Sequence, residues 1–311
     1  MSGTILHIPK VVSGVLTLLL LCLGVCFTGY GQIPEARKID LDGVEIHYIE
    51  KGTGEPLVLL HGGLYDLRSW EPQFAEFAKK YRVISYSRRY SYPNKNSLTD
   101  KYRPAVTDAK DLKALIDKLG LKKVHLVGLS YGALTGLVFA IRNPKMVASM
   151  VLAEPPAHQL VRELPGGERM YHEFIKELEP MKEAFRAGDD RRAIVNFSRN
   201  MGRDFDKLPP AAATAMLQNA PALKAINLSA GPAFPNIKKE DLKKLTIPTL
   251  MLKGEQADRL HAAVTDELAR LIPQAKSIIV PNAGHATPRD NPGFFNAAVL
   301  EFIGSTNALK P

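Results

Sequence analysis

The stretch HLVGLSYGAL (residues 125–134) places a serine between two glycines directly after an apolar run. This pattern predicts a buried strand, a tight turn and a helix, in that order. Gly128 and Gly132 would let the strand and the helix approach each other without a clash of side chains. The turn would expose the Ser130 hydroxyl at the helix N-terminus, where developing negative charge is stabilised. Ser130 is therefore the predicted nucleophile.

A serine hydroxyl is a weak nucleophile unless a neighbouring base takes its proton. The chain has eight histidines, and His285 is the best placed of them because PNAGHATP (281–288) follows the last apolar strand. The C-terminal end of that strand is where Ser130 is also expected. A serine early in the chain and a histidine late in it match one known triad order. We expect His285 to be the base and His125, inside a strand, to be a core residue.

Short apolar runs alternate with amphipathic stretches along most of the chain. Near-continuous apolar runs are typical of parallel strands buried on both faces, and alternation with helices predicts an α/β fold with a mostly parallel sheet. Ile39 to Tyr48 predicts an opening pair of strands that turns at Asp42-Gly43. Thr107 is the expected N-cap of a helix that ends at Gly120. The runs read as strands are 56–60, 81–87, 123–129, 147–153, 248–254 and 275–281.

One block, about residues 155–245, breaks this alternation. It contains no convincing strand, and its polar helical stretches are separated by prolines and glycines. An insertion of this length between two strands predicts a helical cap. The cap would lie over the C-terminal edge of the sheet, where ligands bind in open α/β folds.

The stretch LHGGLYD (60–66) follows the strand at 56–60. We expect His61 to brace this loop by hydrogen bonding, while its glycines let backbone N–H groups turn toward the site. The N–H groups of Gly63 and Tyr131 would then bind the oxyanion of a tetrahedral intermediate. The sequence does not decide between neighbouring N–H groups within residues 62–64, so the assignment to Gly63 is open by one residue.

From about residue 38 to 304 the chain resembles the α/β-hydrolase superfamily. The resemblance is carried by HGG after a strand, GLSYG at the turn, a helical insertion after the sixth strand, and NAGH near the end. It implies an eight-stranded, mostly parallel sheet with helices on both faces and a Ser-His-acid triad. SRRYSYPN (87–94) is similar to an Arg-rich segment of such enzymes, but Tyr90 and Tyr92 replace its usual glycines. We therefore expect this loop to line the pocket differently.

The residues leave the triad acid open between two candidates. The family often places the acid after strand seven, three residues beyond a glycine, whereas Asp258 lies four residues beyond Gly254. Other members carry it after strand six, where Glu154 stands at the end of a buried strand, an unusual place for a glutamate. Asp258 could instead be the N-cap of a helix over 260–271. Glu154 is slightly preferred.

These residues predict a serine hydrolase that acts through an acyl-enzyme, with no cofactor. Ser130 argues against haloalkane dehalogenase and epoxide hydrolase activity, because those relatives use an aspartate nucleophile. No H-E-x-x-H metal motif occurs. Small or medium carboxylic esters are the first expected substrates. One alternative is an aminopeptidase or amidase of short peptides, with Glu163, Glu168 or Glu173 of the cap holding the substrate amine. The other is a non-catalytic ligand-binding protein on the same scaffold.

The first 31 residues have the pattern of a secretory signal peptide. Lys10 is their one charged side chain, an apolar run follows it, and Gly29 and Gly31 precede a cleavage site before Gln32. The alternative is an uncleaved membrane anchor, so contact with a membrane is expected only if this segment is retained. The remaining 32–311 form the expected hydrolase domain. The sequence thus predicts export, to a periplasm or out of the cell.

Composition narrows the chemistry further. Both cysteines, Cys22 and Cys26, lie inside the expected signal peptide. Its removal would leave no thiol for a disulfide, a nucleophile or a metal ligand. The net charge of +9 is carried by scattered basic pairs. Pairs of this kind indicate a solvated surface, so we do not expect nucleic acid as a partner.

Overall fold

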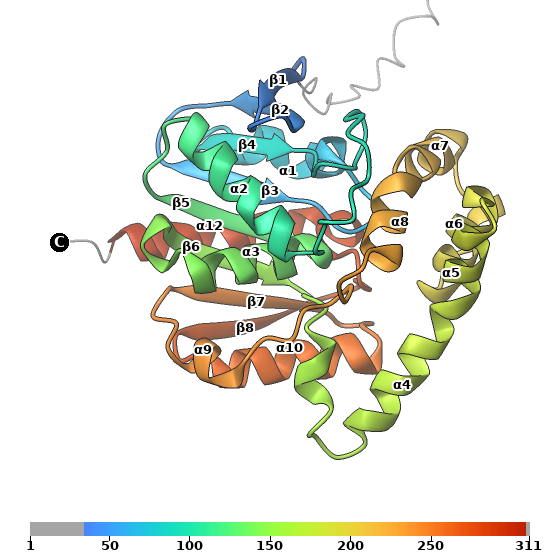
Figure 1. Ribbon diagram of the computed structural model, residues 1–311. Helices are drawn as coiled ribbons and strands as arrows, with labels where there is room; N and C mark the ends of the chain where they lie inside the picture. Colours follow the sequence, from blue (N-terminus) through green and yellow to red (C-terminus); the bar gives the residue numbers. More distant parts are fainter. Residues whose placement is uncertain (1–33, 309–311) are drawn as a thin grey trace, which may run out of the picture. The chain divides into compact units, whose positions relative to one another are not determined.

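The computed structural model describes residues 34–308 (Figure 1). The expected signal peptide at 1–31 lies outside the described residues. The contacts between residues separate the chain after Gln32, and the fold reported below is that of the second unit, Ile33–Pro311. Over the described range 34–308, no helix has the length and apolar character needed to cross a membrane.

Eight strands form a single sheet in the order β1-β2-β4-β3-β5-β6-β7-β8. The β1–β2 and β2–β4 pairings are antiparallel, and all the others are parallel. The predicted mostly parallel sheet and its strands are confirmed. The strands are β1 (Arg37–Asp40), β2 (Glu45–Lys51), β3 (Pro56–Leu60), β4 (Arg82–Tyr86), β5 (Val124–Leu129), β6 (Val147–Ala153), β7 (Thr249–Gly254) and β8 (Ala275–Val280).

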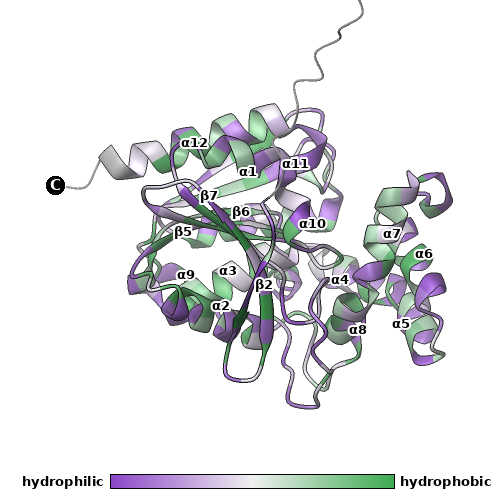
Figure 2. Ribbon diagram, turned by 90° about the horizontal axis from the view of Figure 1, so that it is seen from above, coloured by the Kyte–Doolittle hydropathy of each residue, from purple (hydrophilic) through white to green (hydrophobic). Residues whose placement is uncertain are grey.

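Helices cover both faces of this sheet (Figure 2). Side chains alternate between the faces along each strand. Val58 and Leu60 therefore join the core beneath α2, α3 and α10, whereas Leu57 and Leu59 join the core beneath α1 and α12. The helices are α1 (Glu71–Phe77), α2 (Val106–Lys118), α3 (Tyr131–Arg142), α9 (Lys239–Lys243), α10 (Arg259–Leu271), α11 (Thr287–Asp290) and α12 (Pro292–Ala308).

The segment between β6 and β7 is helical, as expected for residues 155–245. Five of its helices, which we call the inserted helices, stand beside the sheet in Figure 1. They have a small core of their own, built around Met181, Phe185 and Ile194. The inserted helices are α4 (Gly167–Glu177), α5 (Glu179–Arg186), α6 (Asp190–Asn200), α7 (Pro210–Gln218) and α8 (Ala220–Leu228).

The predicted start of α2 is wrong. Thr107 lies inside the helix, and the N-cap is Ala105, which has a left-handed φ of 56° and no side-chain cap. The Thr107 hydroxyl instead accepts a hydrogen bond from the Arg103 backbone N–H at 2.9 Å. A buried contact replaces the cap, because the Ala105 N–H donates to the hydroxyl of Tyr131 on α3.

Candidate active site

Ser130 lies between the end of β5 and the start of α3 with a left-handed φ of 52°. Its neighbours must be small. A Cβ on Gly132 would lie 2.1 Å from the Leu60 carbonyl oxygen, and one on Gly128 would lie 2.7 Å from the Ala133 backbone. Such distances are far inside van der Waals contact, so the two glycines permit the close approach of β3, β5 and α3. The turn holds Ser130 where β5 ends.

Glu154 follows β6 directly and is fully buried, with 0% of its surface exposed. Its φ of 45° is also left-handed. One carboxylate oxygen accepts the Gly254 backbone N–H at 2.8 Å. The other accepts the Nδ1–H of His285 at 2.6 Å. The buried carboxylate therefore holds the imidazole in one tautomer, with its Nε2 free to act as a base.

Asp258, the other candidate acid, is paired with a different histidine. Its Oδ1 accepts the backbone N–H groups of Leu260 and His261, so it is the N-cap of α10. Its Oδ2 lies 2.5 Å from His261 Nδ1. Its side chain is 52% exposed. Burial would raise its pKa, but the hydrogen bond and the charge of His261 hold the pKa of Asp258 well below its usual value.

The two histidines lie against each other, with ring centroids 4.3 Å apart. Burial and the neighbouring His261 lower the pKa of His285, and the bond to Glu154 only partly opposes them. His285 is therefore neutral near pH 7, which is the form that a general base needs. His261 had no distinguishing pattern in the sequence, and only folding brings it to this site.

Ser130 and His285 line the same two cavities. The larger measures about 470 Å³ and extends past Phe197, Met201 and Arg203 of the insertion. The smaller, about 60 Å³, lies against His158 and Asn227. Within residues 34–308, no hydrogen bond joins Ser130 to His285, although both residues line this shared space. Loose contacts of this kind between nucleophile and base are common in ligand-free enzymes.

His61 braces the loop after β3, as expected. Its Nδ1–H donates to the Gly62 carbonyl at 2.9 Å, and its Nε2 accepts the Arg88 backbone N–H at 3.1 Å. Burial and the charge of Arg88 lower the pKa of His61 to about 3, so the ring is neutral. His61 is thus a support of the loop.

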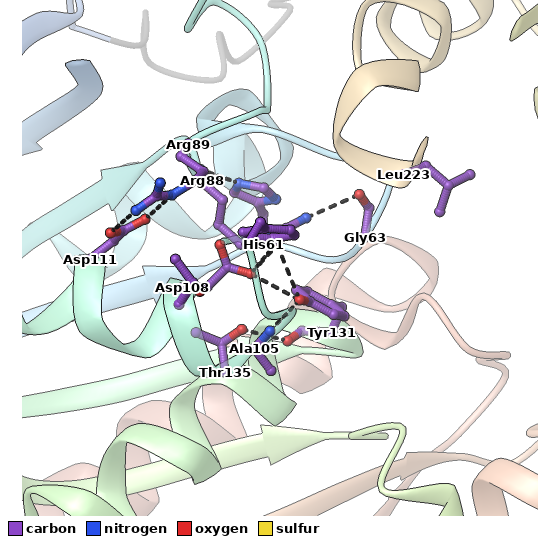
Figure 3. Close-up of polar contacts among 12 residues, drawn as sticks. His61, Gly63, Arg88, Arg89, Ala105, Asp108, Asp111, Tyr131, Thr135 and Leu223 are labelled. Carbon is purple, nitrogen blue, oxygen red and sulfur yellow. Dashed lines mark hydrogen bonds and ion pairs between the residues drawn. The ribbon is translucent and has the colours of Figure 1, made fainter. Parts of the chain in front are cut away.

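The Arg88 guanidinium tethers the same loop (Figure 3). It donates to the carbonyl oxygens of Gly62 at 3.1 Å and Gly63 at 3.0 Å. In a planar trans peptide the C=O and N–H point in opposite directions. Because the Gly62 carbonyl points toward Arg88 and His61, the Gly63 N–H points away from them, and Gly63 borders both cavities.

Arg88 also supports Tyr131, the residue after Ser130. Its guanidinium carbon lies 4.5 Å from the centre of the Tyr131 ring, and its Nη1 lies 3.7 Å from Asp108. The Tyr131 hydroxyl donates to Asp108 at 2.9 Å. The buried Arg88–Asp108 ion pair therefore contacts both residues that are expected to bind the oxyanion. Arg88 donates to the Gly63 carbonyl, and Asp108 accepts from the Tyr131 hydroxyl. The sequence had only the likeness of SRRY to an Arg-rich segment as a signal for Arg88, and nothing marked Asp108.

The structure contradicts the expectation that the loop at 87–94 lines the pocket, and it gives no support to the acids suggested for the aminopeptidase alternative. Tyr90 and Tyr92 border neither of the two cavities. Tyr90 is buried against Tyr102, with ring centroids 4.9 Å apart, and Tyr92 lies under the guanidinium of Arg68. The acids suggested for an amine pocket, Glu163, Glu168 and Glu173, form ion pairs with Lys239, Arg162 and Arg169, apart from both cavities.

Glu154, His261 and His285 are also the residues that could together hold a metal ion. Each offers one ligand atom, and these atoms lie within 4.8 Å of one another. Their hydrogen bonds account for much of this grouping, because Glu154 bonds His285 and His261 faces Asp258.

The fold and the residues at the sheet edge define a hydrolase of the α/β class. Residues 55–292 match the α/β hydrolase fold family, and the chain belongs to this family. It is 26% identical over 281 residues to the uncharacterized carboxylesterase nap of Bacillus subtilis, covering 86% of this chain and 85% of the relative. It is 27% identical over 288 residues to epoxide hydrolase 3 of Mus musculus, covering 88% and 76%.

Its fold is also that of a solved carboxylesterase. The crystal structure of carboxylesterase CesB (YbfK) from Bacillus subtilis superposes with a TM-score of 0.70 at 22% identity, covering 89% of this chain and 93% of that one. The family match and the curated relatives make the protein an enzyme, a carboxylesterase-like α/β-hydrolase.

Proposed function

We propose that the protein hydrolyses carboxylic esters through an acyl-enzyme, with Ser130, His285 and Glu154 as its triad. The supporting observation is the 2.6 Å bond between His285 and the buried Glu154, beside a cavity that Ser130 also lines. Asp258 is assigned the N-cap of α10 and the partner of His261. The serine and this bond favour an acyl-enzyme route over the chemistry of the epoxide hydrolase relative, which matches with similar identity.

In this mechanism His285 Nε2 removes the Ser130 proton as Oγ attacks the ester carbonyl carbon. The negative charge that forms on the carbonyl oxygen is stabilised by the N–H groups of Gly63 and Tyr131. Glu154 stabilises the imidazolium, which then protonates the departing alcohol. Water, deprotonated by His285, then attacks the acyl carbon; the bond from that carbon to Ser130 Oγ breaks, the carboxylic acid leaves, and His285 returns the proton to Oγ.

The proposed substrates are small or medium esters. The names of the relatives, carboxylesterases in two cases, favour this class, and a cavity of about 470 Å³ is of the size that holds a small organic ligand. No observation favours the aminopeptidase alternative, since the suggested acids pair with surface cations.

Labelling with a fluorophosphonate probe tests the triad. We expect Ser130→Ala to abolish labelling, and His285→Ala and Glu154→Ala to slow it strongly. Asp258→Ala is the matched control, since it removes the other carboxylate that faces a histidine at this edge. Absence of labelling in folded wild-type protein would reject the mechanism. The alternative, a non-catalytic ligand-binding protein on the same scaffold, would then be favoured.

We also propose that residues 1–31 direct export and are removed before Gln32. The support is their sequence pattern alone. N-terminal sequencing of protein from the extracytoplasmic fraction tests this. A start at Gln32 is expected, and an intact N-terminus in the membrane fraction would establish the anchor instead.

A further inference from the structure

The wall of the smaller cavity includes residues whose buried polar atoms have no hydrogen-bond partner among residues 34–308. We call this cavity the inner pocket: the residues that line it include Ser130, His285, His158, Asn227, Phe174 and Phe234. Its volume, about 60 Å³, has room for only a few heavy atoms, since a water needs roughly 10–15 Å³. Aromatic and aliphatic side chains form most of its wall.

His158 is the first of the polar groups. It follows β6 by five residues and is fully buried, packed edge-on against Phe174 and Phe234 with ring centroids 4.3 and 4.7 Å away. Within residues 34–308, neither of its ring nitrogens has a hydrogen-bond partner. Burial and the nearby His261 lower its pKa well below the usual value, so the ring is neutral. A neutral imidazole offers one N–H donor and one acceptor nitrogen.

Asn227, on α8, is the second. Its Nδ2 donates to the Leu223 carbonyl at 2.9 Å, which fixes the orientation of the amide. Its Oδ1 is buried and, among the described residues, has no donor. Two elements far apart in sequence, the short 3-10 helix His158–Val161 and α8, thus each contribute to the wall of one small apolar pocket a residue with buried, unpaired polar atoms. Buried polar groups in native proteins are nearly always paired, so a pair of exceptions in one pocket needs a reason.

We propose that the inner pocket binds a short apolar arm of the substrate that carries a hydroxyl group, recognised by His158 and Asn227. This inference rests on the proposed ester hydrolysis and names its substrate class. A hydroxyl both donates and accepts, so it can satisfy the Asn227 Oδ1 and either nitrogen of the neutral His158. A methyl group of the same size would leave these atoms unpaired, which is how polar sites reject apolar analogues.

The hydroxyl can belong to either side of the scissile bond, and matched esters separate the two cases. On the acyl side, p-nitrophenyl 3-hydroxybutyrate is compared with p-nitrophenyl 3-methylbutyrate. On the alcohol side, 2-hydroxyethyl butyrate is compared with propyl butyrate. Within each pair a hydroxyl replaces a methyl group of similar size. We expect wild-type kcat/KM to favour the hydroxyl ester at least about 10-fold in one of the pairs.

Two variants test whether His158 and Asn227 carry this preference. His158→Phe keeps an aromatic ring among Phe174 and Phe234, and Asn227→Leu keeps a similar volume on α8. Each is expected to bring the hydroxyl-to-methyl ratio of kcat/KM close to one. His172→Phe on the exposed surface of α4 is the matched control and should keep the wild-type ratio. If His158→Phe does not fold, Asn227→Leu decides alone.

The outcomes distinguish this inference from the proposed function. Equal kcat/KM for the hydroxyl ester and the methyl ester in both pairs, with Ser130 labelled by fluorophosphonate, would overturn the hydroxyl site. Ester hydrolysis would still be supported. A preference that survives both substitutions would also overturn it. Absence of both turnover and labelling would overturn ester hydrolysis and the inference together.

Discussion

Two histidine–carboxylate pairs lie side by side at the C-terminal edge of the sheet, one at the end of β6 and one at the start of α10. Their hydrogen bonds are nearly equal in length, 2.6 Å for Glu154–His285 and 2.5 Å for Asp258–His261. Their surroundings differ. Glu154 is fully buried and also bonded to Gly254, whereas the side chain of Asp258 is 52% exposed.

The comparison shows that hydrogen-bond length alone does not distinguish the proposed catalytic pair, Glu154–His285, from the Asp258–His261 pair. A carboxylate removed from water orients and stabilises its imidazolium more strongly, because no solvent screens the interaction. An exposed carboxylate at a helix N-terminus already has a structural role there. The partner histidines differ as well: His285 lines both cavities together with Ser130, whereas His261 lines the smaller cavity and not the larger.

The largest expected effect comes from exchanging the acids for amides. Glu154→Gln should lower kcat about 10³-fold to 10⁴-fold, as loss of the acid in a comparable triad does. Asp258→Asn should lower it less than about 10-fold, since an amide at the N-cap leaves the Glu154–His285 bond in place. Steady-state hydrolysis of p-nitrophenyl butyrate measures both. A larger loss of kcat in Asp258→Asn than in Glu154→Gln would contradict the proposal and make Asp258 the triad acid.

Arg88→Met extends the comparison to a second buried carboxylate, Asp108. The variant leaves Asp108 without its cation, and losing one partner of a buried pair costs about 3–5 kcal/mol of unfolding free energy. It also removes the Arg88 hydrogen bonds to the Gly62 and Gly63 carbonyls. We therefore expect kcat of the folded variant to fall more than KM changes. Urea unfolding and hydrolysis rates measure the two effects.

Arg88→Lys serves as the control, because it keeps the charge near Asp108 and loses the forked contact to two carbonyls. It should recover much of the stability and little of the kcat. Full recovery of both would show that charge alone supports the loop.

Burial acts on the histidines as well and makes stability depend on pH. His61 has a pKa of about 3 in the folded protein and about 6.5 when unfolded, so below pH 6.5 the unfolded state binds more protons. Stability is thus complete above pH 6.5 and falls toward pH 3, by about 2 kcal/mol at pH 5 from His61 alone. The lowered pKa values of His158 and His285 act in the same direction. Chemical denaturation between pH 5 and 8 measures this, and a flat profile would contradict it.

The smallest expected effect concerns the structural role of Asp258. Asp258→Ala should lower the unfolding free energy by about 1 kcal/mol, because α10 loses the cap of its first turn. Asp258→Asn should lower it by less, since asparagine is also a good N-cap. Thermal unfolding compares the two. Equal losses would show that the pairing with His261, rather than the cap, carries the stability.

Much of the fold could be predicted because its signals are local. Apolar runs, the glycines around Ser130 and the Asp42-Gly43 turn constrain the backbone through their own chemistry, and the family resemblance implied an eight-stranded, mostly parallel sheet. The start of α2 could not be predicted, because Ala105 is held by the Tyr131 hydroxyl from another helix. The sequence around Thr107 carries no signal of a contact with a residue this far along the chain.

The sequence by itself determined a serine on a strained turn, a late histidine in a loop after a strand, and two acids that could serve it. Their triad roles stay proposals. Only the tertiary structure decided which acid faces which histidine, because Glu154 and His285 are 131 residues apart and meet where β6 ends. It also brought His261, His158 and Arg88 to the site. Burial and contact between distant segments set the charge states of such residues, and neither is encoded in a short stretch of sequence.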